Sequence, residues 1–65
     1  MTFYEELLAK FGYVKTPQLG TNEDGEDVLV SIDRDCACVR TIQNNGRHRI
    51  DIYYPDGTQE ESYER

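Results

Sequence analysis

Three short segments rich in Val, Ile, Thr and Tyr, separated by turn residues, constrain the fold of this chain most. The segments 27–33, 36–43 and 48–54 have the length and composition of β-strands. A polar fourth strand is predicted at 58–63, because Pro55-Asp56-Gly57 before it is a typical turn sequence. The sequence therefore predicts an antiparallel β-meander over residues 27–63, with the fourth strand at its edge.

The turn residues also predict the register of the meander. A two-residue loop at Arg34-Asp35 pairs Val30 with Val39. Asn45-Gly46 favours a two-residue type I′ turn, which pairs Val39 with Ile52. Both hairpins then place their apolar residues on one face. A slip of one residue would move every side chain of a strand to the other face.

The other face of the predicted sheet is more polar. The same register places Arg40 opposite Asp51, a favourable cross-strand charge pair. Apolar area remains beside this pair, from four residues that share the face: Leu29, Cys38, Ile42 and Tyr53.

Residues 2–11 are predicted to form a helix. Thr2 and Glu5 match the capping box, in which each side chain satisfies a backbone N–H of the other residue. Gly12 is placed to end the helix. The apolar stripe expected to face the sheet consists of Phe3, Leu7, Leu8 and Phe11.

The predicted fold is α+β, an N-terminal helix packed on a three- or four-stranded antiparallel meander. Residues 12–26 contain three glycines and a proline between the helix and the first predicted strand, and we expect a loop there. Sixty-five residues make one domain at most, 1–65. No apolar run is long enough to span a membrane, and the first residues lack the features of a signal peptide, so we expect a cytoplasmic protein.

Few residues could carry out chemistry. Cys36 and Cys38 lie two positions apart on a strand, which is too far for a disulfide, and we expect free thiols. In the predicted register His48 lies on the opposite face, so the three residues cannot bind one metal ion. No nucleophile has an evident base partner, and no glycine-rich phosphate loop occurs. We therefore expect no catalytic residues, no metal, no cofactor and no enzymatic activity.

The chain has 13 acidic residues against seven basic ones, a net charge of −6. Such an excess bears on solubility and partners rather than on fold. Three candidate site residues converge at one end of the predicted sheet and three follow the predicted edge strand: Asp33, Asp35 and Asp56, and Glu60, Glu61 and Glu64. These carboxylates could simply keep the protein soluble and its edge unpaired. Alternatively, they could imitate the phosphates of a nucleic acid.

In size, acidity and lack of catalytic residues, the chain resembles the small inhibitors carried by phages and other mobile elements, including anti-CRISPR proteins and DNA mimics. This resemblance covers general character, with no motif behind it. It implies inhibition of a protein with a basic nucleic-acid-binding surface, without direct binding of nucleic acid, by a monomer or weak homodimer. The alternative is a homo-oligomeric or accessory protein-interaction module that uses the outer sheet face.

Overall fold

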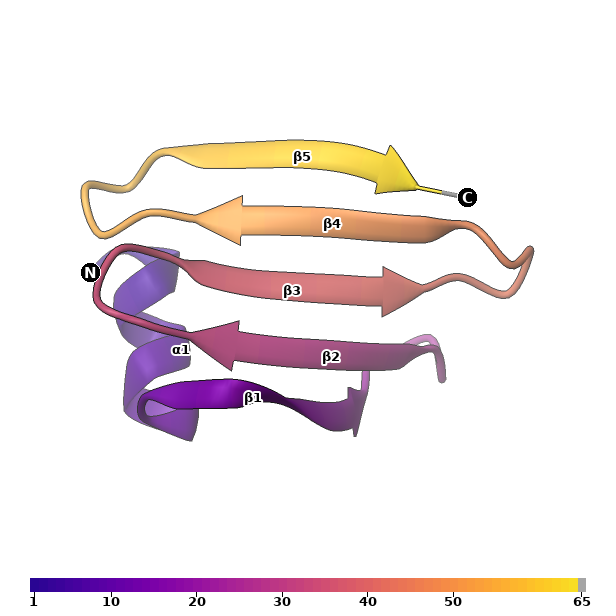
Figure 1. Ribbon diagram of the computed structural model, residues 1–65, viewed down its shortest axis with the longest axis horizontal. Helices are drawn as coiled ribbons and strands as arrows, with labels where there is room; N and C mark the ends of the chain where they lie inside the picture. Colours follow the sequence, from indigo (N-terminus) through magenta and orange to yellow (C-terminus); the bar gives the residue numbers. More distant parts are fainter. Residues whose placement is uncertain (65) are drawn as a thin grey trace.

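The computed structural model describes residues 1–64 and shows one helix on one face of a five-stranded antiparallel sheet (Figure 1). The elements are α1 (Phe3–Phe11), β1 (Val14–Thr21), β2 (Asp27–Ile32), β3 (Ala37–Ile42), β4 (His48–Tyr53) and β5 (Gln59–Glu64). Each strand pairs with the next along the chain, in the order β1-β2-β3-β4-β5. The α+β class is confirmed, and the sheet has five strands rather than three or four.

Helix α1 begins and ends where the sequence indicates. The Thr2 hydroxyl accepts a hydrogen bond from the Glu5 backbone N–H at 3.2 Å, and the Glu5 carboxylate accepts one from the Thr2 N–H at 3.1 Å. This is the predicted capping box, and its hydrogen bonds, first from the Thr2 backbone, lower the pKa of Glu5. Gly12 has a φ of 71° and donates its N–H to the Leu8 carbonyl at 2.8 Å, which ends the helix.

The buried stripe of α1 is rotated from the predicted one. Tyr4 is only 5% exposed and packs with Leu7 and Leu8 against the core of the sheet, whereas Phe3 and Phe11 are 49% and 37% exposed. The Tyr4 hydroxyl donates a hydrogen bond to the Asp33 carbonyl at 2.6 Å. Tyrosine can be buried here because its polar end has this partner. The core cluster consists of Tyr4, Val30, Ile32 and Ala37.

The predicted loop 12–26 contains strand β1. This strand pairs with β2 at the edge of the sheet, and its register shifts between Val14 and Gln18. Pro17 lies within that irregular stretch. Because proline has no N–H, it is tolerated in a strand only at such an edge or bulge. Pro17 and Gly20 therefore interrupt the sequence pattern of a strand without preventing the strand.

The first predicted hairpin is confirmed and the second is wrong by one residue. Val30 lies opposite Val39, as expected. In the β3–β4 hairpin, Gln43 donates its N–H to the Arg47 carbonyl at 2.9 Å, which leaves a three-residue loop, 44–46. Gly46 has a φ of 85°, the left-handed conformation that such a loop requires. Val39 consequently lies opposite Asp51 rather than Ile52.

This difference of one residue turns every side chain of β4 to the other face. Asp51 and Tyr53 lie on the helix side, and Ile50 and Ile52 lie on the outer face. The predicted pairing of Arg40 with Asp51 is wrong, because Arg40 lies opposite Ile50.

Ile32 is 1% exposed in the core, and its truncation should destabilise the protein strongly. We expect Ile32→Ala to lower the free energy of unfolding by about 2–5 kcal/mol, the usual cost of a buried isoleucine truncation. Urea denaturation followed by circular dichroism measures this change. Leu19→Ala is the matched control, since Leu19 is 70% exposed and its truncation should change stability by no more than about 0.5 kcal/mol. Equal effects of the two substitutions would contradict this placement of the core.

Candidate binding surfaces

The six carboxylates singled out in the sequence lie in two groups. Asp33 and Asp35 are in the turn between β2 and β3, and Asp56 is in the turn between β4 and β5. Both turns lie at the end of the sheet that α1 crosses (Figure 1). Strand β5 carries the others, but Glu64 pairs in register with His48, at the opposite end of the sheet. The structure therefore brings together the three aspartates and not all six residues.

Two of these aspartates are held in place by their own turns. The Asp33 Oδ1 atom accepts hydrogen bonds from the N–H groups of Asp35 and Cys36, at 2.8 and 2.9 Å. The Asp56 Oδ1 atom accepts from the Thr58 hydroxyl at 2.6 Å and from its N–H at 2.9 Å. These bonds, first the one from the hydroxyl, lower the pKa of Asp56 and keep the carboxylate ionised.

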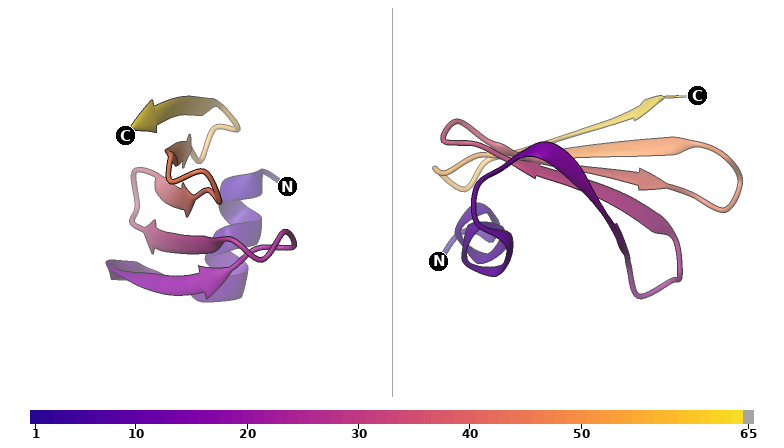
Figure 2. Two further views of the ribbon diagram at one scale, coloured as in Figure 1. Left: turned by 90° about the vertical axis from the view of Figure 1, so that its right-hand side faces the viewer. Right: turned by 60° about the horizontal axis from the view of Figure 1, so that its bottom comes forward.

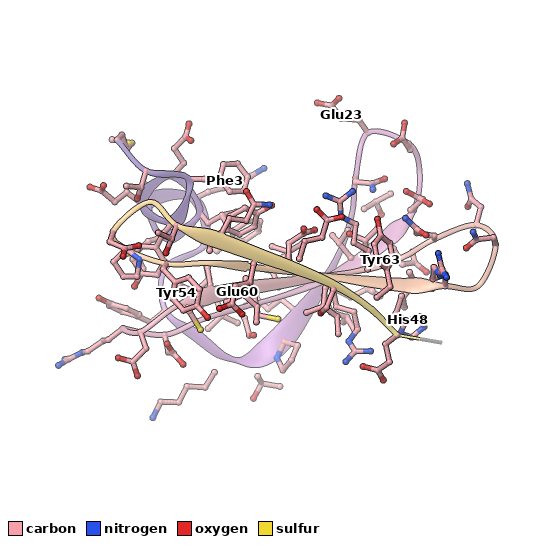
Figure 3. All side chains as sticks on the ribbon, turned by 90° about the horizontal axis from the view of Figure 1, so that it is seen from above. Phe3, Glu23, His48, Tyr54, Glu60 and Tyr63 are labelled. Carbon is pink, nitrogen blue, oxygen red and sulfur yellow. The ribbon has the colours of Figure 1, made fainter. Side chains whose placement is uncertain are left out.

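The glutamates of β5 alternate between the two faces of the sheet. Glu60 and Glu64 lie on the outer face, and Figure 3 shows Glu60 on the side opposite Phe3. Glu64 forms an ion pair with Arg40 at 3.3 Å, and Glu61, on the helix side, forms one with Arg49 at 3.4 Å. Two of the six candidate carboxylates therefore already have arginine partners within the chain. Such exposed pairs contribute at most about 1 kcal/mol each.

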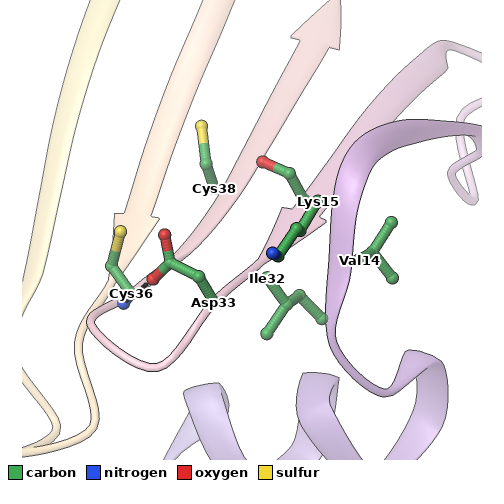
Figure 4. Close-up of a pocket in the computed structure, with 7 residues that line it drawn as sticks. Val14, Lys15, Ile32, Asp33, Cys36 and Cys38 are labelled. Atoms are coloured by element: carbon green, nitrogen blue, oxygen red, sulfur yellow. Dashed lines mark hydrogen bonds between the residues drawn. The ribbon is translucent and has the colours of Figure 1, made fainter.

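The two cysteines border a shallow hollow beside the β2–β3 turn (Figure 4). Both are free thiols. Burial, and next the charge of Asp33, raise the pKa of Cys36, and burial raises that of Cys38 although Arg40 opposes it. A thiol with a raised pKa forms less of the nucleophilic thiolate near neutral pH.

The position of His48 differs from the prediction. It lies on the outer face, the same face as Cys38, and its Nδ1 atom is 2.9 Å from an Arg40 guanidinium nitrogen. The reason is again the register of β4. Within residues 1–64, no group of three or more His, Cys, Asp and Glu side chains is arranged to hold a metal ion.

The thiols should react slowly in the folded protein. Because the fold raises both cysteine pKa values, alkylation by iodoacetamide at about pH 8, near the ordinary thiol pKa, should be several-fold slower than in the urea-unfolded chain. Mass spectrometry of timed samples measures the rate at each cysteine. Equal rates in the folded and unfolded chains would contradict this prediction.

The outer face of the sheet carries an apolar surface. No element of residues 1–64 covers it, as the two views in Figure 2 show. Leu29, Cys38 and Ile42 lie there as predicted, but Tyr53 does not: its ring is on the helix side, 4.5 Å from the ring of Phe3. The apolar members of this outer-face patch, partly or largely exposed, are Leu19, Leu29, Cys38, Ile42, Ile50 and Ile52.

The helix side of the sheet is only partly covered. Helix α1 crosses one end of the strands, and the β1–β2 turn rises on the same side at the other end, where Figure 3 shows Glu23. Between them lies a hollow of about 280 Å³, the helix-side hollow. Its floor is Val28, Val30, Val39, Thr41, Asp51 and Tyr53, and its walls are Phe3, Leu7, Lys10 and Phe11 on one side and Thr21 and Asn22 on the other.

Asp51 is the buried charge of this hollow, with only 6% of its surface exposed. The Arg49 Nε atom lies 3.2 and 3.1 Å from its two carboxylate oxygens, and this contact raises the pKa of Arg49. Sequence reasoning missed Asp51 as a buried group because its face depends on the register of one hairpin.

No protein-family model, no curated protein and no solved structure matches this chain. No helix within residues 1–64 is long and apolar enough to cross a membrane. Function is therefore inferred from the surfaces described above.

Proposed function

We propose that this chain is a protein-interaction module that docks on a partner through the outer-face patch. The observation that carries the proposal is the orientation of β4, which places Ile50 and Ile52 on the same uncovered face as Leu29 and Ile42. A contiguous exposed apolar patch on a small protein is typical of an interaction site.

The surroundings of the patch support this proposal. Arg40 lies within the patch, between Leu29 and Ile50. The far edge carries His48, Glu60 and Glu64, so that apolar residues adjoin a polar rim, as in many protein interfaces. The sheet measures about 19 Å across its strands and about 20 Å along them, by ordinary strand spacing and rise. This area is at the low end for a specific interface and suits a transient contact. A cytoplasmic location belongs to the proposal and agrees with the free thiols.

Lysine in place of Ile50 tests the outer-face patch. We expect Ile50→Lys to weaken binding at least about tenfold, since it removes apolar area from the patch and adds a second positive charge next to Arg40. Sedimentation over a range of concentrations measures association with a second copy, and titration against a captured partner measures binding to another protein. Gln59→Lys, which adds the same charge on the helix side of β5, is the control and should bind normally. Unchanged binding by Ile50→Lys in both assays would refute the proposal.

A second candidate function is inhibition of a nucleic-acid-binding protein by charge mimicry. The favouring observation is that turns hold the carboxylates of Asp33 and Asp56 at one end of the sheet, beside exposed Asp35. Fixed carboxylates need no reordering when they meet a basic surface. The ion pairs of Glu61 and Glu64 restrict this mimicry to the turn end and the neighbouring Glu60.

Charge mimicry predicts that Asp33, Asp35 and Asp56 matter for binding and not for folding. Their joint replacement by Asn keeps an oxygen that can accept the turn hydrogen bonds, so the melting temperature should hardly change. Displacement of labelled DNA from a basic partner should weaken, mainly through a slower association rate. Equal displacement by the wild type and the variant, or none by either, would exclude mimicry at this end.

A further inference from the structure

The helix-side hollow combines an apolar lining with a buried carboxylate. Phe3, Leu7 and Phe11 form one wall, and valines form much of the floor around Asp51. Its volume of about 280 Å³ is near the lower limit of ordinary ligand pockets. The hollow therefore suits one long side chain rather than a whole small molecule.

Asp51 retains capacity to accept hydrogen bonds. An ionised carboxylate offers about four acceptor positions. The interactions of the Asp51 side chain within residues 1–64 come from Arg49 Nε, and Arg49 is shared with Glu61 at 3.4 Å. Two carboxylates thus share one guanidinium, which leaves one negative charge in excess beside the apolar floor. A buried charge is stabilised when a group of opposite charge pairs with it.

The lysine that lines the hollow does not supply that partner. Lys10 lines the hollow, but its Nζ atom lies over the Phe11 ring, 5.3 Å from the ring centre, and it forms no ion pair within 4 Å in residues 1–64. Exposed Glu23 and Asp24 lie in the β1–β2 turn on the opposite side, which favours an approaching cation.

We propose that the helix-side hollow binds a lysine side chain of a basic segment in a partner protein. The ammonium group lies at Asp51, and the alkyl stem packs against Phe3 and Phe11. Lysine fits better than arginine because Arg49 already occupies an edge of the carboxylate, which leaves room for a compact charge and not for a planar fork. This site is on the face opposite the outer-face patch and does not depend on it.

An NMR titration with short peptides tests the site. The probe is a capped seven-residue peptide with one lysine between two leucines, and its control has norleucine in place of the lysine. The lysine peptide should shift the backbone amides of Val39, Thr41 and Asp51 and bind about tenfold more tightly than the control. Arginine in place of the lysine should bind less well. Equal binding of the lysine and norleucine peptides, or shifts confined to the outer face, would overturn the proposal.

Two variants and two controls locate the contact. Asp51→Asn should abolish the preference for lysine over norleucine, whereas Glu61→Gln, which removes the same charge from the other partner of Arg49, should keep most of it. Thr41→Phe should block both peptides by filling the hollow from its floor without changing any charge. If Asp51→Asn does not fold, Thr41→Phe decides. Wild-type affinity of Thr41→Phe, or an unchanged lysine preference in Asp51→Asn, refutes the site. Ile50→Lys should bind the lysine peptide normally, which separates this proposal from the outer-face function.

Discussion

The three-residue loop 44–46 is the constraint on which the arrangement of surfaces depends. Gly46 takes a positive φ, and the Gln43 N–H donates to the Arg47 carbonyl. The loop therefore has three residues, one more than a two-residue turn at Asn45-Gly46. Side chains alternate along a strand, so this one residue decides which face each member of β4 occupies. Asp51 then faces the helix side, and Ile50 and Ile52 face outward.

The excess of negative charge is distributed unevenly through the fold. Asp33 and Asp56 accept hydrogen bonds within their own turns. Glu26 joins the β1–β2 and β3–β4 turns, because it accepts hydrogen bonds from Asn22 and Asn44. Asp51 is buried beside Arg49. Much of the acidity therefore has a local structural role. This leaves apolar area as the stronger argument for binding, because the partly exposed isoleucine side chains gain from burial against a partner whereas exposed carboxylates are well solvated.

The two faces of the sheet have different shapes and suit different contacts. The outer face is uncovered and carries branched aliphatic side chains, which suits a broad contact. The helix side is concave between α1 and the β1–β2 turn and contains a buried carboxylate, which suits one cationic side chain. Because the faces point in opposite directions, the two proposed contacts do not compete for the same surface.

The sequence by itself determined the elements whose signals are local. The capping box of Thr2 and Glu5, the end of α1 at Gly12, the turn at Arg34-Asp35 and the α+β class all follow from residues close together in the chain. Tertiary structure decided the features that depend on residues distant in the sequence, namely strand β1 and the register of the β3–β4 hairpin. Strand β1 is interrupted by Pro17 and Gly20, and pairing with β2 makes it a strand. The segment Asn44-Asn45-Gly46 allows a hairpin loop of two or three residues, and the two lengths place Ile50 and Ile52 on opposite faces of the sheet. Local turn preferences differ too little to choose between them, so the packing of the whole sheet set the register, and with it the positions of Asp51, Ile50 and Ile52.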